Sequence, residues 1–230
     1  YHAEIMCGIV GYVGSGTTER DAKNVIIEGL RRLEYRGYDS AGVAVVNDGT
    51  IECRKKAGKV ADLEAEIADN PIPASNLGIG HTRWATHGGP TDANAHPHVV
   101  GDGRLAVVHN GIIENFAHLK AELVDKGYSF KSETDTEVAG ALLLDIYDNE
   151  AGGDLTRAMQ LTAQCLEGAF TLLAIHADQQ DRIVAARWNS PLVIGVGEGE
   201  NFLSSDVAGF IEFTRNAVEM DNGQIVTLTA

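Results

Sequence analysis

The chain has 230 residues, of which 44% are hydrophobic and 22% charged, fractions that match folded globular domains rather than disordered, collagen-like or coiled-coil proteins. Its length is enough to bury the core of one large domain. Acidic residues outnumber basic ones by 33 to 18, and the resulting net charge of −15 disfavours nucleic acid and anionic membranes as partners.

Apolar residues that alternate or run continuously over short segments predict strands. In chain order, the predicted strands are residues 8–13, 42–47, 51–55, 77–82, 104–109, 169–176, 182–187, 192–196, 201–204 and 224–229. Apolar residues at helical spacing predict helices over residues 18–33, 115–126, 134–146 and 155–166. Thr134 and Glu137 form a capping box at the start of the third helix.

Short turn signals between the strands favour antiparallel pairing, namely Asn47-Asp48-Gly49, Asp102-Gly103 and Asn222-Gly223. Because the helices cluster between strand-rich ends, the sequence predicts a single domain of the α+β class. Periodicity alone leaves open whether the strands form one sheet or two sheets packed face to face. Residues 1–6 stand apart as an extension or expression remnant ending in an initiator methionine, and we expect the domain to span residues 7–230.

Several features concern cellular location. The longest apolar runs, such as residues 169–175, are far shorter than the roughly 20 residues that span a bilayer, and no signal segment opens the chain. The three cysteines, Cys7, Cys53 and Cys165, lack the even, regular spacing of a disulfide framework. We therefore expect a protein of the reducing cytoplasm. Scarce lysine leaves two sources open, a salt-loving organism and an ordinary acidic cytosol.

Cys7 is the first candidate for chemistry, because it follows Met6, a residue commonly removed when the next side chain is small. Removal would leave a free α-amino group, which titrates at about 7.7–8.0 and can take the thiol proton. The alternative is a buried cysteine at the start of a strand, and the residue type alone favours that alternative. Cys53 and Cys165 fall inside a predicted strand and a predicted helix, and we expect them to be buried structural residues.

Asn110 and Gly111 follow a predicted strand, and an asparagine amide beside a glycine N–H is the donor pair that an oxyanion hole needs. The alternative is a plain Asn-Gly turn. Arg83 offers a planar fork for a carboxylate, and Asp135 offers a fixed negative charge for an ammonium group. Together they would bind an amino acid, and the alternative for each is a surface ion pair.

Histidines crowd the middle of the sequence, at His81, His87, His96, His98 and His109. Their spacing lacks the i, i+4 helical pair or the cysteine partners of common zinc sites. We therefore expect no metal, and nothing in the sequence calls for another cofactor.

Six segments, taken together and in this order, resemble those of the glutamine amidotransferases that use an N-terminal cysteine as nucleophile, most closely their amino-sugar-forming branch. The segments are Cys7-Gly8-Ile9-Val10-Gly11 and residues 30–42, 81–88, 94–98, 109–115 and 132–138. The related amidophosphoribosyltransferases have His-Arg-Gly-Gln where this chain has Tyr35-Arg36-Gly37-Tyr38. The resemblance covers the chain from Cys7 onward. It implies the four-layer αββα fold of N-terminal-nucleophile hydrolases, with two antiparallel sheets flanked by helices.

The resemblance also implies roles for individual residues. Cys7 would attack the side-chain amide of L-glutamine with its own α-amino group as base, while Asn110 and the Gly111 N–H hold the oxyanion. Arg83 would bind the substrate α-carboxylate, and Asp135 its α-ammonium group. The other implied site residues are Thr86, His87 and Gly88 in the substrate pocket, Arg36 and Gly37 near the nucleophile, and Trp84 in a loop that covers glutamine.

Three features depart from the family pattern. Cys7 is internal in the chain as written, so we expect activity only after residues 1–6 are cleaved. The chain ends where two sugar isomerase domains should begin, so we expect glutamine hydrolysis alone. In the complete enzyme, the ammonia would convert fructose-6-phosphate to glucosamine-6-phosphate, and the missing domains would form a homo-oligomer. Asn189 stands where the family usually has glycine, and asparagine is the other residue that best tolerates positive φ.

Two other functions remain open on the sequence. One is a non-catalytic glutamine-binding or regulatory domain in which the extension blocks the nucleophile. The other is an amidotransferase domain of the amidophosphoribosyltransferase type. Release of ammonia by protein with an exposed Cys7 would distinguish an enzyme from a binding domain.

Overall fold

The computed structural model describes residues 7–85 and 87–230; the expected extension at residues 1–6 and the expected pocket residue Thr86 lie outside the described residues. The strands are β1 (Gly8–Gly14), β2 (Ser40–Asn47), β3 (Thr50–Ala57), β4 (Leu77–Arg83), β5 (His98–Val100), β6 (Leu105–Ile113), β7 (Gly168–His176), β8 (Gln179–Trp188), β9 (Val193–Val196), β10 (Glu200–Ser204), β11 (Ala217–Glu219) and β12 (Ile225–Leu228). The helices are α1 (Ala22–Leu33), α2 (Val60–Asp69), α3 (Phe116–Asp125), α4 (Asp135–Asn149) and α5 (Leu155–Cys165), and short 3-10 turns lie at Glu34–Arg36 and Val207–Gly209.

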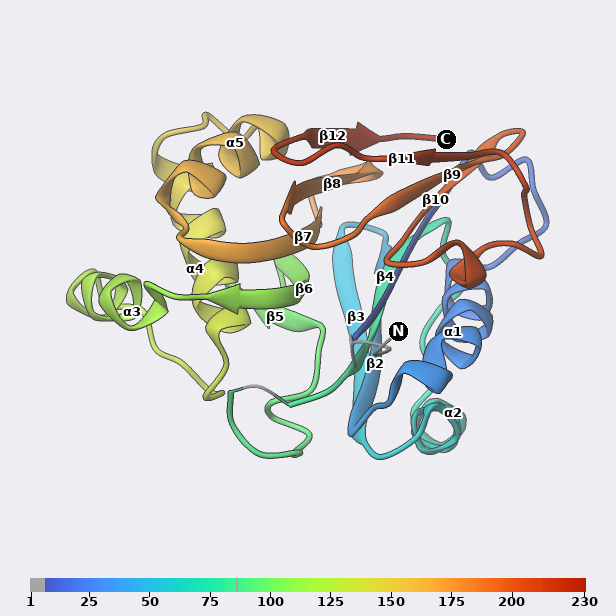
Figure 1. The fold of residues 1–230 in the computed structure, drawn as a ribbon, viewed down its shortest axis with the longest axis horizontal. Helices are drawn as coiled ribbons and strands as arrows, with labels where there is room; N and C mark the ends of the chain where they lie inside the picture. The colour runs from blue at the N-terminus through green and yellow to red at the C-terminus, as the bar shows by residue number, and fades with distance from the viewer. Residues whose placement is uncertain (1–6, 86) are drawn as a thin grey trace.

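The strands form two antiparallel sheets that pack face to face, with helices on both outer faces (Figure 1). The seven-stranded sheet has the order β11-β9-β10-β1-β4-β2-β3, and the five-stranded sheet has the order β12-β8-β7-β6-β5. Helices α1 and α2 cover the first sheet, whereas α4 and α5 cover the second and α3 packs beside α4. The α+β class and the four-layer αββα arrangement are therefore confirmed.

Apolar side chains alternate between the two faces of the central strands and so contact the layers on both sides. In β1, Ile9 and Val13 face the second sheet, while Val10 and Tyr12 face α1. The same alternation runs along β6, where Ala106 and Val108 join the core between the sheets and Leu105 and Val107 pack toward α4. Because side chains alternate across a strand, each central strand contributes to two cores. The apolar core between the two sheets therefore packs β1 and β4 of one sheet against β6 of the other.

The predicted strands and helices are all present, with ends shifted by a few residues. The first helix begins at Ala22 rather than at residue 18, because the Asp21 side chain caps it by accepting from the Lys23 N–H. Helix α2 was not predicted, nor were the three-residue strands β5 and β11. Within the described residues, no helix is both long and apolar enough to cross a bilayer.

Two of the three turn signals join paired strands. Asn47-Asp48-Gly49 connects β2 to β3, with φ of 48° at Asp48 and 74° at Gly49, and Asp102-Gly103 lies between β5 and β6. The prediction of antiparallel pairing at Asn222-Gly223 is wrong, because β11 and β12 belong to different sheets. That turn carries the chain from one sheet to the other.

Candidate active site

A cavity of about 250 Å³ lies where β1 and β4 of the seven-stranded sheet approach β6 of the other sheet. Cys7 comes directly before β1, Arg83 ends β4, and Asp135 begins α4. The residues that line the cavity are Cys7, His81, Arg83, Trp84, His87, His96, His109, Asn110, Gly111, Ile112, Asp135, Thr136, Ala169, Asn189 and Ser190. Most of the predicted site residues therefore meet at one place, although they come from four separate elements.

The Cys7 thiol is held by the loop that follows β4. The Trp84 backbone N–H donates to Cys7 Sγ at 3.1 Å. Burial raises the pKa of the Cys7 thiol, while the Trp84 amide and the positive charge of Arg83 offset part of that rise. The thiol is therefore protonated at neutral pH, and a base is needed to make it a nucleophile.

The orientation of the Asn110 amide follows from its neighbours. His81 Nε2 lies 3.0 Å from the carbonyl oxygen of His109, so this nitrogen must carry the proton. The same nitrogen lies 2.9 Å from Asn110 Oδ1, which accepts from it. Asn110 Nδ2 therefore faces Cys7 and donates to its carbonyl at 2.8 Å. Burial lowers the pKa of His81 to about 3, so the ring is neutral at pH 7.

The interpretation of Asn110-Gly111 as a plain turn is wrong, because both residues lie inside β6. Gly111 has a φ of 116°, and a Cβ at this position would collide with the Ala169 carbonyl of β7. Glycine is thus required by a close approach of two paired strands. The Asn110 amide and the Gly111 backbone are held side by side in the cavity wall.

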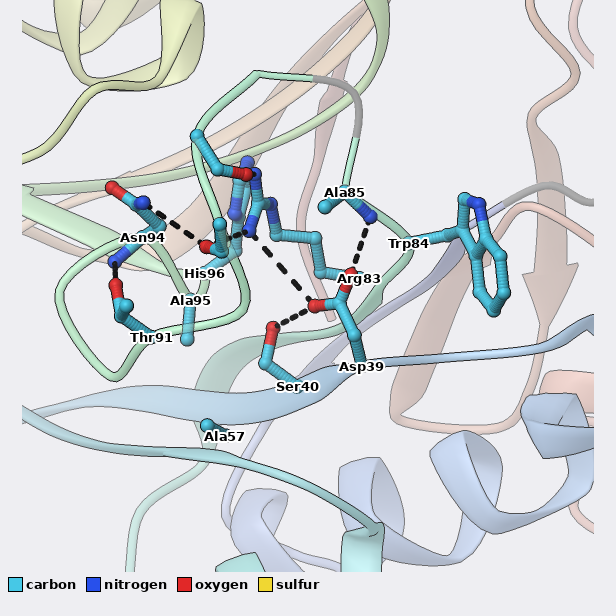
Figure 2. A network of polar contacts seen from close by, with 12 residues as sticks. Asp39, Ser40, Ala57, Arg83, Trp84, Ala85, Thr91, Asn94, Ala95 and His96 are labelled. Atoms are coloured by element: carbon cyan, nitrogen blue, oxygen red, sulfur yellow. Dashed lines mark hydrogen bonds and ion pairs between the residues drawn. The ribbon is translucent and has the colours of Figure 1, made fainter.

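Arg83 is 3% exposed, so it is not a member of a surface ion pair. Its Nη2 donates to the carbonyls of His87 and Gly88, and its Nη1 donates to that of Gly89 at 3.2 Å. Asp39 lies on the other side, with Oδ1 3.9 Å from Arg83 Nη1 (Figure 2). These contacts fix the plane of the guanidinium at the cavity wall.

Asp39 connects Arg83 to the loop that holds the thiol. Its carboxylate accepts from the Ser40 hydroxyl at 2.9 Å and from the backbone N–H of Ala85 (Figure 2). Its own N–H donates to the Arg83 carbonyl at 2.6 Å. Asp39 was not predicted as a site residue, and its place in the segment 30–42 was the only signal.

Asp135 is also 3% exposed, which excludes a surface ion pair. It is the first residue of α4, and the preceding Thr134 caps the helix by accepting from the Glu137 N–H. Asp135 Oδ2 accepts from the Ile113 N–H at 2.9 Å, and Oδ1 lies 3.7 Å from His109 Nδ1. The positive end of the helix dipole stabilises the buried carboxylate.

Three further buried histidines, His96, His98 and His109, bond to threonines at the start of α4. His96 Nε2 and His109 Nδ1 lie 2.7 and 3.0 Å from Thr136 Oγ1, and His98 Nε2 lies 2.8 Å from Thr134 Oγ1. Burial lowers the pKa of all three rings, so they are neutral packing residues. His96 also stacks on His81 at 4.5 Å. We call these four residues, His81, His96, His98 and His109, the histidine cluster.

Some predicted residues lie near the cavity without lining it. Within the described part of the chain, Arg36, Gly37 and Gly88 are absent from the cavity wall. Arg36 Nη1 donates to Ser205 Oγ at 3.1 Å, and the same oxygen accepts from the Ile9 N–H, so Arg36 is linked to β1. Trp84 is 45% exposed at the rim.

The other two cysteines differ from each other. Cys53 is partly buried in β3, and burial raises the pKa of its thiol to about 11. Cys165 is exposed at the last position of α5, so the expectation of a buried structural cysteine is wrong there. The cavity residues that sequence reasoning did not single out for substrate contact include Thr136, Ile112, Ala169 and Ser190.

A four-layer sandwich with a cysteine at the start of a central strand is the arrangement of the N-terminal-nucleophile hydrolases. The sequence model of one family, the glutamine amidotransferase domain, matches residues 68–230. The chain belongs to this family.

Curated relatives point to one branch of the family. A glutamine–fructose-6-phosphate aminotransferase (isomerizing) of Corynebacterium glutamicum is 72% identical over 227 residues, or 98% of this chain and 36% of the relative. The proteins of the same name from Corynebacterium diphtheriae and Streptomyces coelicolor are 74% and 61% identical, covering 98% and 97% of this chain and 36% and 35% of those relatives. The chain thus spans about a third of the length of these relatives.

Solved structures share the fold. The glutamine phosphoribosylpyrophosphate amidotransferase from B. subtilis matches with a TM-score of 0.79 at 23% identity, over 97% of this chain and 47% of that chain. A structure described as the allosteric regulatory enzyme of purine biosynthesis matches with a TM-score of 0.81 at 24% identity, with the same coverage. At this level of identity the similarity concerns the fold alone.

Proposed function

We propose that this domain hydrolyses L-glutamine to L-glutamate and ammonia, with Cys7 as the nucleophile. The observation that supports this most directly is the meeting of Cys7, Asn110, Gly111, Arg83 and Asp135 in the wall of one cavity. A thiol beside amide donors suits acyl transfer. A buried guanidinium and a buried carboxylate suit the two charged groups of an amino acid.

The proposed chemistry has two halves. The free α-amino group of Cys7 takes the thiol proton, and Sγ attacks the side-chain amide carbon of glutamine to form a tetrahedral oxyanion. Asn110 Nδ2 and the Gly111 N–H hold that oxyanion. The carbon–nitrogen bond then breaks, and the α-ammonium gives its proton to the leaving ammonia. Water hydrolyses the remaining thioester, which releases glutamate and restores the thiol.

This mechanism requires cleavage of the bond between Met6 and Cys7, because a peptide nitrogen has no basic lone pair. Burial raises the pKa of the Cys7 thiol, so at neutral pH an adjacent base is needed to remove the thiol proton. Arg83 would bind the substrate α-carboxylate and Asp135 its α-ammonium. Thr86 and His87 would line the pocket, Trp84 would belong to the loop over glutamine, and Gly88, Arg36 and Gly37 would support the site from outside.

We also infer the setting of this reaction. Residues 7–230 would be the ammonia-producing domain of a glutamine–fructose-6-phosphate aminotransferase, a proposal supported by 72% identity to the Corynebacterium glutamicum protein of that name. The ammonia would then pass to fructose-6-phosphate, bound by sugar isomerase domains outside this chain, which would also form the homo-oligomer. The cysteines, free in the structure, fit a reducing cytoplasm.

Glutamate formation from L-glutamine tests the first proposal, with two proteins compared: one that begins at Cys7, verified by N-terminal mass, and one that retains residues 1–6. We expect turnover only in the first. Binding of glutamine without release of ammonia by the first protein would instead indicate a non-catalytic binding domain.

A second experiment tests which acceptor receives the ammonia. The full-length protein is supplied with glutamine and either fructose-6-phosphate or phosphoribosyl pyrophosphate. Amination of phosphoribosyl pyrophosphate would indicate the amidophosphoribosyltransferase type.

A further inference from the structure

Asn94 is a buried side chain in the loop between β4 and β5, and it bonds to two separate parts of the chain. Its Nδ2 donates to the Gly89 carbonyl at 3.1 Å and to Glu133 Oε2 at 3.1 Å. Its Oδ1 accepts from the Glu133 N–H at 3.0 Å. Only 2% of Asn94 is exposed, whereas Gly89 and Glu133 are exposed, so the amide reaches from the interior to two residues at the surface.

The two neighbours of Asn94, Gly89 and Glu133, are each connected to a charged residue of the cavity. The Gly89 carbonyl that accepts from Asn94 also accepts from Arg83 Nη1 at 3.2 Å, and Figure 2 shows Asn94 and Arg83 in one polar network. Glu133 precedes Thr134, the cap of α4, and Asp135 is the first residue of that helix. One amide group therefore bridges the segment that orients Arg83 and the segment that carries Asp135.

The bridge needs the particular chemistry of asparagine. Its oxygen accepts a backbone N–H, while its nitrogen donates both to a backbone carbonyl and to a carboxylate. An aspartate in its place could not donate, and it would set a second negative charge against Glu133. The Asn94 amide also packs against Gly88, whose φ is 75° and where a Cβ would meet Asn94 Nδ2. The loop is thus shaped around this side chain.

We propose that Asn94 is a positioning residue that fixes Arg83 relative to Asp135 and thereby makes the site selective for the α-amino acid end of the substrate. This inference rests on the proposed function of Arg83 and Asp135. Asn94 does not line the cavity within the described residues, and its side chain bonds to neither Cys7 nor Asn110. Its loss should therefore weaken recognition of the two charged groups while leaving the reaction at the thiol intact.

The test uses Asn94→Asp and Asn94→Ala in protein that begins at Cys7, with four amides as substrates. These are L-glutamine, 4-aminobutanamide without the α-carboxylate, glutaramate without the α-ammonium, and butanamide without either. We expect kcat/KM for glutamine to fall about 10- to 100-fold through KM, with kcat within about threefold of the parent value. The kcat/KM for butanamide should stay nearly constant, so the preference for glutamine collapses.

Asn115→Asp is the matched control, because the Asn115 amide also donates to a backbone carbonyl and accepts from a backbone N–H, and it lies outside the cavity. Its Nδ2 donates to the Cys165 carbonyl at 2.9 Å, and its Oδ1 accepts from the Glu167 N–H at 3.1 Å. This variant should retain the preference for glutamine. Thermal unfolding of each variant checks that it is folded, and the affinity for L-glutamate, measured by calorimetry, gives a readout that does not need turnover.

The outcomes separate the two proposals. Suppose that the parent protein hydrolyses glutamine and that kcat/KM of the folded Asn94 variants falls by the same factor for all four amides. Asn94 is then only a structural residue, and this inference is overturned. Unchanged affinity of both variants for L-glutamate would also overturn it. If the parent itself releases no ammonia from glutamine, the proposed function fails instead.

Discussion

The backbone N–H of Trp84 donates a hydrogen bond of 3.1 Å to Sγ of Cys7. Trp84 directly follows Arg83, and the carbonyls of residues 87–89 fold back to accept from the Arg83 guanidinium. A single loop therefore contacts the thiol at its start and holds the guanidinium in its next turn. Any substrate bound by Arg83 would lie against the same loop that contacts the Cys7 thiol.

Replacing the nucleophile gives the first prediction. In protein that begins at Cys7, Cys7→Ala should lower glutamine hydrolysis by more than about 10³-fold, because no thioester can form. Glutamine should still bind, as measured by calorimetry, since Arg83 and Asp135 remain. Cys165→Ser, at an exposed cysteine at the end of α5, is the control and should keep full activity. Normal turnover in Cys7→Ala would exclude the proposed mechanism.

Asn110 gives the second prediction. Asn110→Asp keeps the shape but places a carboxylate oxygen where Nδ2 donates to the Cys7 carbonyl at 2.8 Å. Loss of one oxyanion donor costs roughly 10²–10³ in kcat, and the added repulsion should make Asn110→Asp worse than Asn110→Ala. Steady-state kinetics should show the loss mainly in kcat, because the neutral substrate amide needs the donor less than the intermediate does. Near-parental kcat in both variants would show that Asn110 only shapes the strand.

Most of the predicted site residues line one cavity, but their local structure was predicted less well. Asn110 and Gly111 were predicted as an oxyanion pair, but Asn-Gly also signals a turn, and nothing nearby in sequence excludes one. The turn is excluded by pairing with β7, a strand far along the chain, whose Ala169 carbonyl lies against Gly111. Arg83 and Asp135 are similar, because their burial depends on contacts between distant segments.

Other features were missed for different reasons. Helix α2 carries Val60, Leu63 and Ile67 at helical spacing, so its signal was present in the sequence and was overlooked. The histidine cluster was considered only as a possible metal site, whereas His96 and His109 share the Thr136 hydroxyl. That pairing joins the loop before β5, strand β6 and α4, and no local pattern encodes it. The φ of 58° at Asn189 agrees with the expected tolerance of asparagine for a glycine position.

Arg83 gives the third prediction. Arg83→Lys keeps the charge, but an ammonium on a flexible stem cannot reproduce the planar contacts to the carbonyls of residues 87–89. We expect KM for glutamine to rise by about 10²-fold, corresponding to about 3 kcal/mol of lost binding. Arg31→Lys, at a half-exposed residue paired with Glu64 on the far side of the first sheet, should leave KM unchanged. An unchanged KM in Arg83→Lys would argue against Arg83 as the carboxylate ligand.

The histidine cluster gives the fourth prediction, which concerns stability and pH. Burial lowers the pKa of His81 to about 3 and lowers those of His96, His98 and His109 as well, whereas an unfolded histidine titrates near 6.5. Below pH ~6.5 the unfolded chain therefore binds protons that the native protein does not. The free energy of unfolding should fall as the pH falls from ~6.5 toward the folded-state values, by up to about 1.4 kcal/mol per pH unit for each histidine of the cluster that stays neutral in the folded protein.

Urea unfolding between pH 7.5 and 5.5 measures this dependence. His98→Gln can keep a hydrogen bond to Thr134 while removing one titrating ring, so its slope below pH 6.5 should be smaller than that of the parent by up to about 1.4 kcal/mol per pH unit. His118→Gln is the control, because the side chain of His118 is 74% exposed on α3 and should leave the slope unchanged. A free energy of unfolding that stays constant from pH 7.5 to 5.5 in the parent would mean that the cluster takes up protons in the folded state. In that case His81 would still donate to Asn110 through Nε2, but a protonated His109 would place a positive charge 3.7 Å from Asp135 Oδ1.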